Sequence, residues 1–445
     1  MLRLYEILEG YGRKEFSTKE ILEEIRKRIK EHENLNAFIT LNHEEAPESA
    51  LPIAVKDNIV TKDLRTTAGS KILENYVPPY NATAIDRLLK KKFYVVGKTN
   101  LDEFGMGSTG ENSAFGPTLN PHDNTLVPGG SSSGSGAAVG AGIVPAALGS
   151  DTGGSVRLPA AYCGVWGFKP SYGMVSRFGL IAFASSLDVI GVIARSAKDI
   201  TLIMEMISGY DPKDVTSLRV EGIRRERVEA LKRERWKIGI PKNLIDGIDG
   251  RIVKKFEEFI RELERFSEIV EFEMKYTDFA LAAYYVISSS EASSNLARYD
   301  GVRYGNSALG ENLWESYKRT RELFGREVKR RIGIGTFALS YGYYDRYYLK
   351  ALMARRLIKE EIDGVLRGID FIVLPTSPSL PPKLGSGFSP IDYYNLDRLT
   401  VPFSLAGVPV MNVPIGVFIG AQVVGRFGGD EEVLAFSEIL EDLIG

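Results

Sequence analysis

The sequence is poor in the residues on which many catalytic and metal sites depend. A single cysteine, Cys163, excludes an intrachain disulfide and any metal site built from several cysteines. The three histidines, His32, His43 and His122, all lie in the first third of the 445-residue chain. The other two-thirds therefore cannot use histidine as a base or a metal ligand. There is also only one glutamine, Gln422.

Excess charge and long apolar runs are missing as well. The 56 lysines and arginines nearly balance the 58 aspartates and glutamates, so the net charge is −2 and gives no overall attraction to nucleic acid. The longest uncharged stretch, residues 124–150, is broken by proline, glycine and serine, and its apolar part is too short to cross a bilayer. The first ten residues carry charges and contain no secretory signal. We expect a cytoplasmic protein without membrane contact.

The composition is that of a globular protein, with 44% apolar and 26% charged residues. Apolar periodicity predicts strands that alternate with helices, which favours an α/β architecture. The expected strands are 51–60, 93–96, 236–241 and 371–375, and the expected helices begin near residue 18 and cover 83–92, 137–147, 251–266 and 351–366. Residues 212–235 are strongly charged and are interpreted as a solvated helix that connects two halves of the chain.

Two short motifs suggest functions that their surroundings do not support. Gly105 to Gly110 has the glycine spacing of a dinucleotide-binding loop, but a strand should precede it and a helix should follow it, and the sequence predicts neither. Gly130 to Gly134 matches the nucleophile elbow of α/β hydrolases. That triad needs a histidine after the serine, and none follows His122.

The most informative segment is residues 129–159, GGSSSGSGAAVGAGIVPAALGSDTGGSVRLP. Its first half could be a flexible linker, but a linker would not continue into an apolar, core-like run. Serine needs a base to become a nucleophile, and without histidine a buried, neutral lysine is the natural choice. The glycines before Ser155 allow several backbone N–H groups to converge, and such a group stabilises the oxyanion of acyl transfer.

This segment resembles the signature of the amidase signature family. The resemblance implies a serine nucleophile, Ser155, and a bridging serine on a cis peptide, Ser131. It also implies a lysine base, Lys56, and an oxyanion hole at Thr152, Gly153 and Gly154. In the proton path so implied, Ser131 passes the proton between Lys56 and Ser155.

The resemblance covers nearly the whole chain and implies an α/β fold with a large mixed β-sheet core flanked by helices on both faces. Residues 1–445 then form a single amidase signature domain. Its signature core is about 50–210, its charged connection about 212–235, and its C-terminal half, about 236–445, completes the sheet and the substrate pocket.

Further segments, among them 98–107, 183–188 and 291–304, are similar to one branch of the family, the A subunits of glutamyl-tRNA(Gln) amidotransferase. That resemblance implies a glutaminase that hydrolyses glutamine and supplies ammonia to a B subunit, which converts Glu-tRNA(Gln) to Gln-tRNA(Gln). A small C subunit would complete the complex. We expect no cofactor and no metal in this chain, with ATP and Mg²⁺ on the partner subunit.

The same branch implies residues that recognise free glutamine. Arg331 would hold the α-carboxylate, Asp397 the α-ammonium, and Tyr284 would line the pocket. Arg330 and Tyr285 are adjacent alternatives for the arginine and the tyrosine.

Two other functions stay open on sequence grounds. One is a stand-alone amidase that acts on small amides, and the other is a non-catalytic scaffold subunit. The joint presence of Lys56, Ser131 and Ser155 argues against the scaffold.

Overall fold

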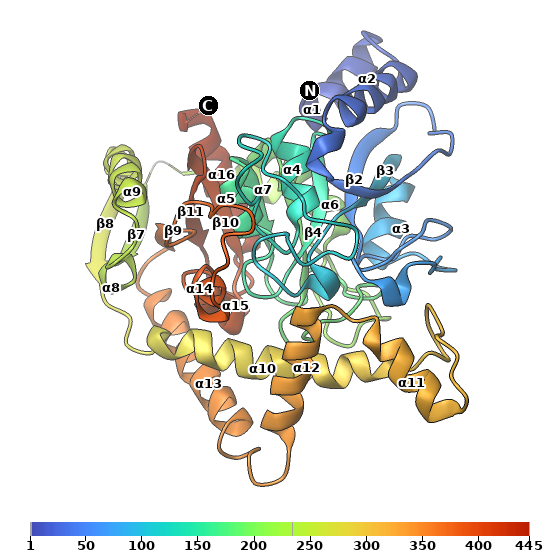
Figure 1. Ribbon diagram of the computed structural model, residues 1–445. Coiled ribbons are helices and arrows are strands. Elements are labelled where there is room, and N and C mark those ends of the chain that lie inside the picture. The colour runs from blue at the N-terminus through green and yellow to red at the C-terminus, as the bar shows by residue number, and fades with distance from the viewer. Residues whose placement is uncertain (1, 234, 445) are drawn as a thin grey trace.

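The computed structural model describes residues 2–233 and 235–444, and an 11-stranded mixed sheet forms its centre (Figure 1). The strand order is β1-β3-β2-β4-β6-β5-β10-β11-β9-β7-β8. The strands are β1 (Phe38–Leu41), β2 (Leu51–Lys56), β3 (Phe93–Thr99), β4 (Ala146–Asp151), β5 (Trp166–Lys169), β6 (Val189–Ala194), β7 (Trp236–Pro241), β8 (Ser267–Phe272), β9 (Phe371–Pro375), β10 (Val410–Gly416) and β11 (Ile419–Val424).

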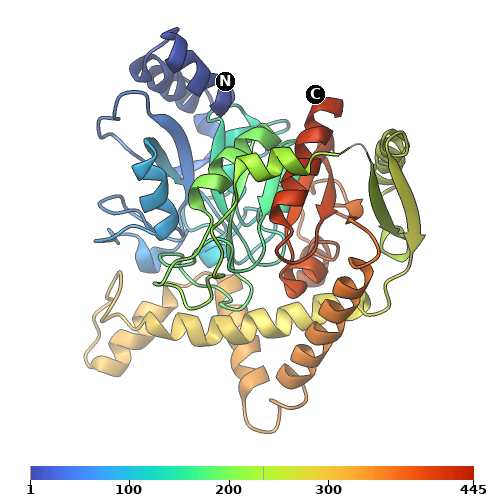
Figure 2. The same cartoon turned by 180° about the vertical axis from the view of Figure 1, so that it is seen from behind.

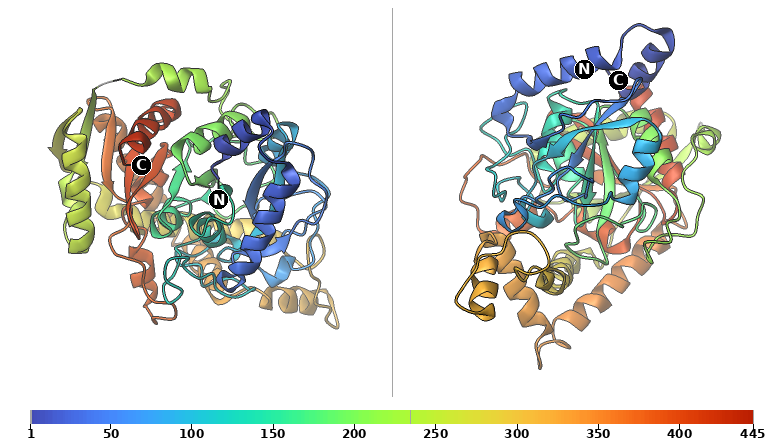
Figure 3. Two further views of the ribbon diagram at one scale, coloured as in Figure 1. Left: turned by 90° about the horizontal axis from the view of Figure 1, so that it is seen from above. Right: turned by 90° about the vertical axis from the view of Figure 1, so that its right-hand side faces the viewer.

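Helices cover both faces of this sheet, as the view from above in Figure 3 and the reverse view in Figure 2 show. Helices α3, α6 and α16 pack on one face, and α4 and α5 pack on the other. The described helices are α1 (Leu4–Arg13), α2 (Thr18–Glu31), α3 (Thr83–Lys90), α4 (Ser133–Gly140), α5 (Arg157–Tyr162), α6 (Ala197–Ile207), α7 (Arg225–Leu231), α8 (Lys242–Ile245), α9 (Gly250–Leu263), α10 (Ala280–Asn295), α11 (Leu313–Glu322), α12 (Arg326–Leu339), α13 (Tyr348–Val365), α14 (Pro390–Asn395), α15 (Val401–Ala406) and α16 (Asp430–Ile444). The expected mixed α/β sheet flanked by helices is confirmed.

The middle of the sheet brings segments of the signature together. β2 lies between β3 and β4 and is parallel to both, so that the ends of β2 and β4 are neighbours. Both strands are buried along their whole length, which explains why most of their residues are apolar. A lysine at the end of β2 and a serine near the end of β4 therefore face each other inside the protein.

Two of the local predictions were wrong. The small apolar run 137–147 is not one helix, because α4 ends at Gly140 and β4 begins at Ala146. Gly142 between them adopts a positive φ of 67°, which ends the helix, and the remaining apolar residues fill a central strand instead. In the charged segment 212–235 only Arg225–Leu231 is helical, and Glu234 lies outside the described residues.

A helical layer crosses the lower end of the sheet in Figure 1. α10 runs along this end, and α12 and α13 both pack against α10 and project away from the sheet. The start of α12 and the segment before α15 border the signature loops, so this layer closes one side of the candidate site. No helix in the described ranges is both long enough and apolar enough to cross a membrane.

Candidate active site

Lys56 ends strand β2 and is completely buried. Its Nζ donates to the Ser131 hydroxyl at 2.7 Å, to the Ser150 hydroxyl at 2.9 Å and to the Ser150 carbonyl at 3.2 Å. Three oxygen partners hold the amine in one position without any carboxylate in contact. This is the environment that a lysine needs to be neutral and still oriented.

Burial lowers the pKa of Lys56 to about 7, although the carboxylates of Asp102, Asp151 and Asp188 oppose the shift. Asp57, the next residue in sequence, is not among the carboxylates that oppose the shift. Asp57 accepts hydrogen bonds from Thr67 and lies 3.9 Å from the Lys98 amine. The buried lysines of the neighbouring strands β2 and β3 therefore differ: Lys98 has a carboxylate within 4 Å, and Lys56 has only hydroxyl and carbonyl partners.

Ser131 follows a cis peptide bond from Gly130, as the family resemblance implied. A side chain at Gly130 would overlap the Asp102 carboxylate, which itself accepts the N–H groups of Gly110 and Asn112. The next residue, Ser132, donates its N–H to the Ser155 carbonyl at 3.1 Å. The backbones that carry Ser131 and Ser155 are thus side by side.

The turn before Ser155 depends on two glycines. Gly154 has a φ of 147°, a region that favours glycine, and a Cβ there would overlap the Thr400 side chain. A Cβ at Gly153 would overlap the Tyr284 ring. Within the described ranges, the N–H groups of the predicted oxyanion hole, Thr152, Gly153 and Gly154, and that of Ser155 donate to no protein acceptor, so they are free to receive an oxyanion.

A buried ion pair holds this turn from behind. Arg157 donates to both oxygens of Asp151 at 3.0 and 3.1 Å and to the Thr400 carbonyl at 3.0 Å. Asp151 also accepts the N–H of Val156, the residue after the candidate nucleophile. Burial alone would raise the pKa of Asp151, but the Arg157 guanidinium holds this pKa below its ordinary value. The turn is therefore fixed at both ends by a charged pair that water cannot reach.

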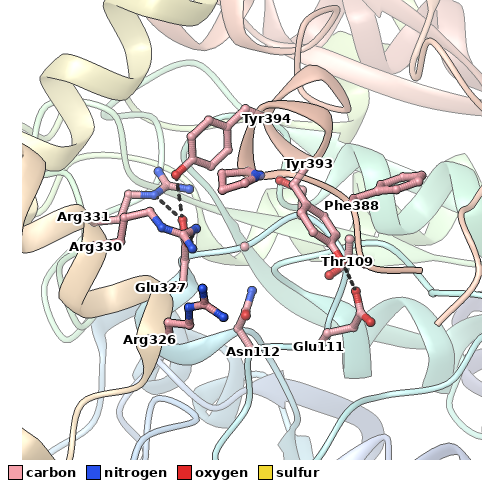
Figure 4. Close-up of a pocket in the computed structure, with 14 residues that line it drawn as sticks. Thr109, Glu111, Asn112, Arg326, Glu327, Arg330, Arg331, Phe388, Tyr393 and Tyr394 are labelled. Carbon is pink, nitrogen blue, oxygen red and sulfur yellow. Dashed lines mark hydrogen bonds and ion pairs between the residues drawn. The ribbon is translucent and has the colours of Figure 1, made fainter. Parts of the chain in front are cut away.

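A pocket of about 330 Å³ lies between the loop 107–112, the start of α12 and the segment 387–394, and Figure 4 shows its lining. Arg331 of α12 points toward it, with 3% of the residue exposed, and donates its Nε to Glu327 at 2.7 Å. The guanidinium lies 4.4 and 4.9 Å from the ring centres of Tyr285 and Tyr394, two rings that stack on each other at 3.8 Å. Its Nη1 is buried and has no partner in the described part of the chain.

Arg330 also borders the pocket but is more exposed than Arg331 and pairs with Glu327. Of the two candidates, Arg331 alone combines burial with an unused donor. That difference favours Arg331 as the carboxylate ligand, which stays a prediction.

Asp397, the predicted partner of the α-ammonium, is buried. It accepts hydrogen bonds from the Ser108 hydroxyl and the Tyr285 hydroxyl, both at 2.8 Å. Burial raises the pKa of Asp397 to about 6. Tyr284 packs against Gly153 instead, edge-on to Tyr285 at 5.0 Å. The two tyrosines thus have different partners: Tyr284 contacts the turn before Ser155, and Tyr285 contacts Asp397 and Arg331.

Sequence reasoning missed several residues that complete the site. Ser150, Asp102, Glu327 and Ser108 each touch a predicted site residue or its loop. Asp102 precedes the glycine-rich run 105–110 and Ser108 lies within it. The rejection of this run as a dinucleotide loop is consistent with the structure, because neither a strand directly before it nor a helix directly after it is present. The run instead forms a loop around the Asp102 carboxylate. The glycines of this run were the sequence signal that could have identified it as part of the site.

Comparison with known proteins agrees with this geometry. The sequence profile of the family described as Amidase matches residues 19–434, so the chain belongs to the amidase family. The A subunit of the glutamyl-tRNA(Gln) amidotransferase of Sulfurisphaera tokodaii is 48% identical to it, over 96% of this chain and 93% of that protein. The corresponding protein of Halothermothrix orenii is 45% identical, over 100% and 97% of the two chains.

A solved structure extends the comparison to three dimensions. The A subunit of the glutamyl-tRNA(Gln) amidotransferase of Thermotoga maritima superposes with a TM-score of 0.83 at 40% identity, and the match covers 98% of this chain and 93% of that one. The chain is an amidase-family α/β enzyme, and the two relatives and the solved structure named above carry the same name.

Proposed function

We propose that this chain is the glutaminase of a tRNA-dependent amidotransferase, in which it forms the A subunit. The observation that carries the proposal is the completely buried Lys56 amine, 2.7 Å from the Ser131 hydroxyl, beside the turn that presents Ser155. A lysine in this setting is a base near neutral pH, because its pKa is about 7.

The chemistry follows from these positions. Neutral Lys56 takes the proton of Ser131, which takes the proton of Ser155 as its oxygen attacks the carboxamide carbon of glutamine. The N–H groups of Thr152, Gly153 and Gly154 receive the oxyanion. The proton returns to the amide nitrogen, the C–N bond breaks and ammonia leaves. Water then hydrolyses the acyl-enzyme by the same route and releases glutamate.

Recognition of glutamine uses the two charged groups that simple amides lack. The α-carboxylate pairs with the unused Nη1 of Arg331, and the α-ammonium pairs with Asp397. Tyr285 touches both of these residues, so the two recognition charges are held at a fixed separation. A site for small neutral amides would have no use for a buried, opposite pair of charges, which weighs against the stand-alone amidase.

The ammonia would serve a B subunit that activates the glutamate of Glu-tRNA(Gln) with ATP and Mg²⁺, with a small C subunit in the complex. The name shared by the relatives implies such a multi-subunit enzyme. In this proposal ATP, Mg²⁺ and tRNA are bound by the partners, and this chain supplies only the ammonia.

One experiment tests the assignment. The chain is co-expressed with the B and C subunits encoded in the same genome, and formation of Gln-tRNA(Gln) from Glu-tRNA(Gln) is measured with glutamine as the nitrogen donor. We expect amidation with the wild type and none with Ser155→Ala. A chain that hydrolyses neutral amides faster than glutamine and supports no amidation would instead be a stand-alone amidase.

A further inference from the structure

Glu327 stands out in the pocket because its carboxylate contacts three other side chains that line it. Its Oε1 accepts the Nε–H of Arg331 at 2.7 Å and the hydroxyl of Tyr394 at 3.2 Å, and its Oε2 accepts a hydrogen bond from Arg330. Only 10% of the Glu327 side chain is exposed. Figure 4 shows the carboxylate among these donors. None of the catalytic steps proposed above uses Glu327.

Two ordinary roles of a helix glutamate do not account for these contacts. Glu327 is the second residue of α12, where an acidic side chain stabilises a helix through its dipole. It also lies four residues before an arginine, and such pairs are common on surfaces and contribute little to stability. Glu315 and Arg319 on α11 form a pair of that kind, with 36% and 51% of their side chains exposed. Arg331 is only 3% exposed, so its pair with Glu327 is placed in the wall of the pocket instead.

The hydrogen bond at Nε determines which side of Arg331 is open to a ligand. A guanidinium binds a carboxylate through two adjacent N–H groups, either along the edge that includes Nε or at the end formed by its two Nη atoms. Glu327 occupies Nε, so the first edge is taken. Nη1, at the other end, is buried and has no partner in the part of the chain that the structure describes. A substrate carboxylate can therefore form two hydrogen bonds with Arg331 only at the Nη end.

The aromatic rings beside Arg331 do not set this direction. The rings of Tyr285 and Tyr394 lie 4.4 and 4.9 Å from the guanidinium. A ring attracts a cation but offers no directed acceptor, so it fixes the position of a guanidinium better than the direction of its N–H groups. Among the described residues, Glu327 is the one acidic side chain that pairs with Arg331. The directed contact therefore comes from Glu327, which the Tyr394 hydroxyl holds in turn.

We propose that Glu327 is a positioning residue for glutamine recognition, which holds Arg331 by Nε and thereby presents the Nη end of the guanidinium to the α-carboxylate of the substrate. This inference rests on the proposed function, which assigns the α-carboxylate to Arg331. Because Glu327 acts through Arg331, its loss should affect a substrate that has the carboxylate and spare one that lacks it. Arg330 binds the other oxygen of Glu327, so loss of Arg330 leaves the contacts of Oε1 in place.

The test compares two substrates that differ only in the group that Arg331 binds. The full chain is co-expressed with the B and C subunits, and ammonia release is measured for glutamine and for glutamine α-amide, in which a neutral carboxamide replaces the α-carboxylate. We expect Glu327→Ala to raise the KM for glutamine about tenfold, because binding must then order the released guanidinium. Glu327→Gln keeps an acceptor oxygen and should raise this KM less. The KM for the α-amide, and kcat for both substrates, should change less than about twofold.

A double variant shows whether Glu327 acts through Arg331. In the Arg331→Ala background, the further change Glu327→Ala should leave the KM for glutamine unchanged, because the group to be positioned is gone. An independent, structural effect would add to that of Arg331→Ala. Glu315→Gln is the matched control, since it removes the charge from the exposed pair of the same spacing on α11, and it should behave like the wild type. Glu327→Gln preserves the shape of the side chain, so it decides the question even if Glu327→Ala does not fold.

The outcomes are distinguishable. An unchanged KM for glutamine in the Glu327 variants would overturn the positioning role and leave the proposed function intact. A lower KM would overturn it as well, because Glu327 would then only compete with the substrate for Arg331. Equal increases in the KM for glutamine and for its α-amide would make Glu327 a structural residue. A wild-type complex that hydrolyses no glutamine would overturn the proposed function itself.

Discussion

The side-chain nitrogen of Lys56 lies 2.7 Å from the hydroxyl oxygen of Ser131, although 75 positions separate the two residues in the chain. Lys56 comes from the end of a buried strand, and Ser131 from the loop that enters α4. Because neither side chain is accessible to solvent, the hydrogen bond joins a potential base to a potential proton carrier without competition from water. The following predictions test what this pair and its surroundings do.

Replacement of Ser155 by alanine should abolish glutamine hydrolysis, because the acyl-enzyme can no longer form. The fold should persist, since the turn is held by its glycines and by Asp151 and Arg157. Activity is measured as glutamate release and folding as the melting temperature. A variant that retains more than about a tenth of the wild-type rate would remove Ser155 from the mechanism.

In the complex, the Ser155→Ala variant should lose only the glutamine-dependent reaction. With the B and C subunits present, Ser155→Ala should still support amidation of Glu-tRNA(Gln) when ammonium replaces glutamine, because only the source of ammonia is lost. Loss of the ammonium-driven reaction as well would show that Ser155 has a role beyond glutamine hydrolysis or that assembly has failed.

Replacement of Lys56 by alanine should lower kcat at least about 10³-fold, the range for removal of an acid–base group. Lys56→Arg should fail as well, since a guanidinium stays protonated and cannot accept a proton. Lys98→Ala is the contrasting variant, because Lys98 donates to the Ile59 carbonyl and to hydroxyls outside the site. It should lower stability through the unpaired Asp57 carboxylate. An active Lys56→Arg enzyme would contradict the general-base role.

The pH dependence of kcat/KM should show the titration of two separate groups, Lys56 and Asp397. Burial lowers the pKa of Lys56 to about 7, so the neutral base is lost as the pH falls below 7, and kcat/KM should drop about tenfold per pH unit for every amide. Burial raises the pKa of Asp397 to about 6, so its charge disappears below pH 6. The extra loss below pH 6 should affect glutamine and spare a neutral amide. A profile that is flat between pH 5.5 and 8 would contradict both assignments.

Arg331→Ala should raise the KM for glutamine strongly and change kcat/KM for a neutral amide little, because only glutamine brings a carboxylate to be paired. Asp397→Asn should act similarly through the ammonium. Arg330→Ala is the matched control and should leave both substrates nearly unchanged. Equal damage to the two substrates by Arg331→Ala would make this arginine structural, and a selective effect of Arg330→Ala would transfer the role to its neighbour.

Gly154→Ala should lower kcat at least about 10²-fold, because a Cβ at this position meets Thr400 and the backbone adopts a φ of 147°. We expect stability to fall by about 1–3 kcal/mol, as for other overpacked core sites. Gly333→Ala on α12 is the control, since its Cβ would meet no atom within 4 Å. Urea unfolding and glutaminase assays measure the two effects, and a fully active Gly154→Ala enzyme would refute the role of the turn.

The sequence alone determined the elements and the chemistry wherever the signal was local. Helix α2 begins at Thr18, as predicted, after a capping box of Ser17 and Glu20, and β7 and β9 have the predicted bounds. Periodicity and caps act over a few residues, so they can be read without the fold. The family signature likewise placed a lysine and two serines in one mechanism, and the missing histidines excluded the hydrolase triad.

Only the tertiary structure decided which groups surround these residues. Asp57 follows Lys56 in sequence, yet it faces Lys98, while Asp102, Asp151 and Asp188 act on the Lys56 pKa from other segments. The run 137–147 contains residues compatible with both a helix and a buried strand. Its last residues form the start of a strand, because they pair with β2 on one side and β6 on the other. Tyr284 and Tyr285 are neighbours on one helix, and packing against Gly153 or Asp397 gave them different contacts. Contacts between residues far apart in sequence depend on strand order and helix packing, and no local pattern of residues encodes these.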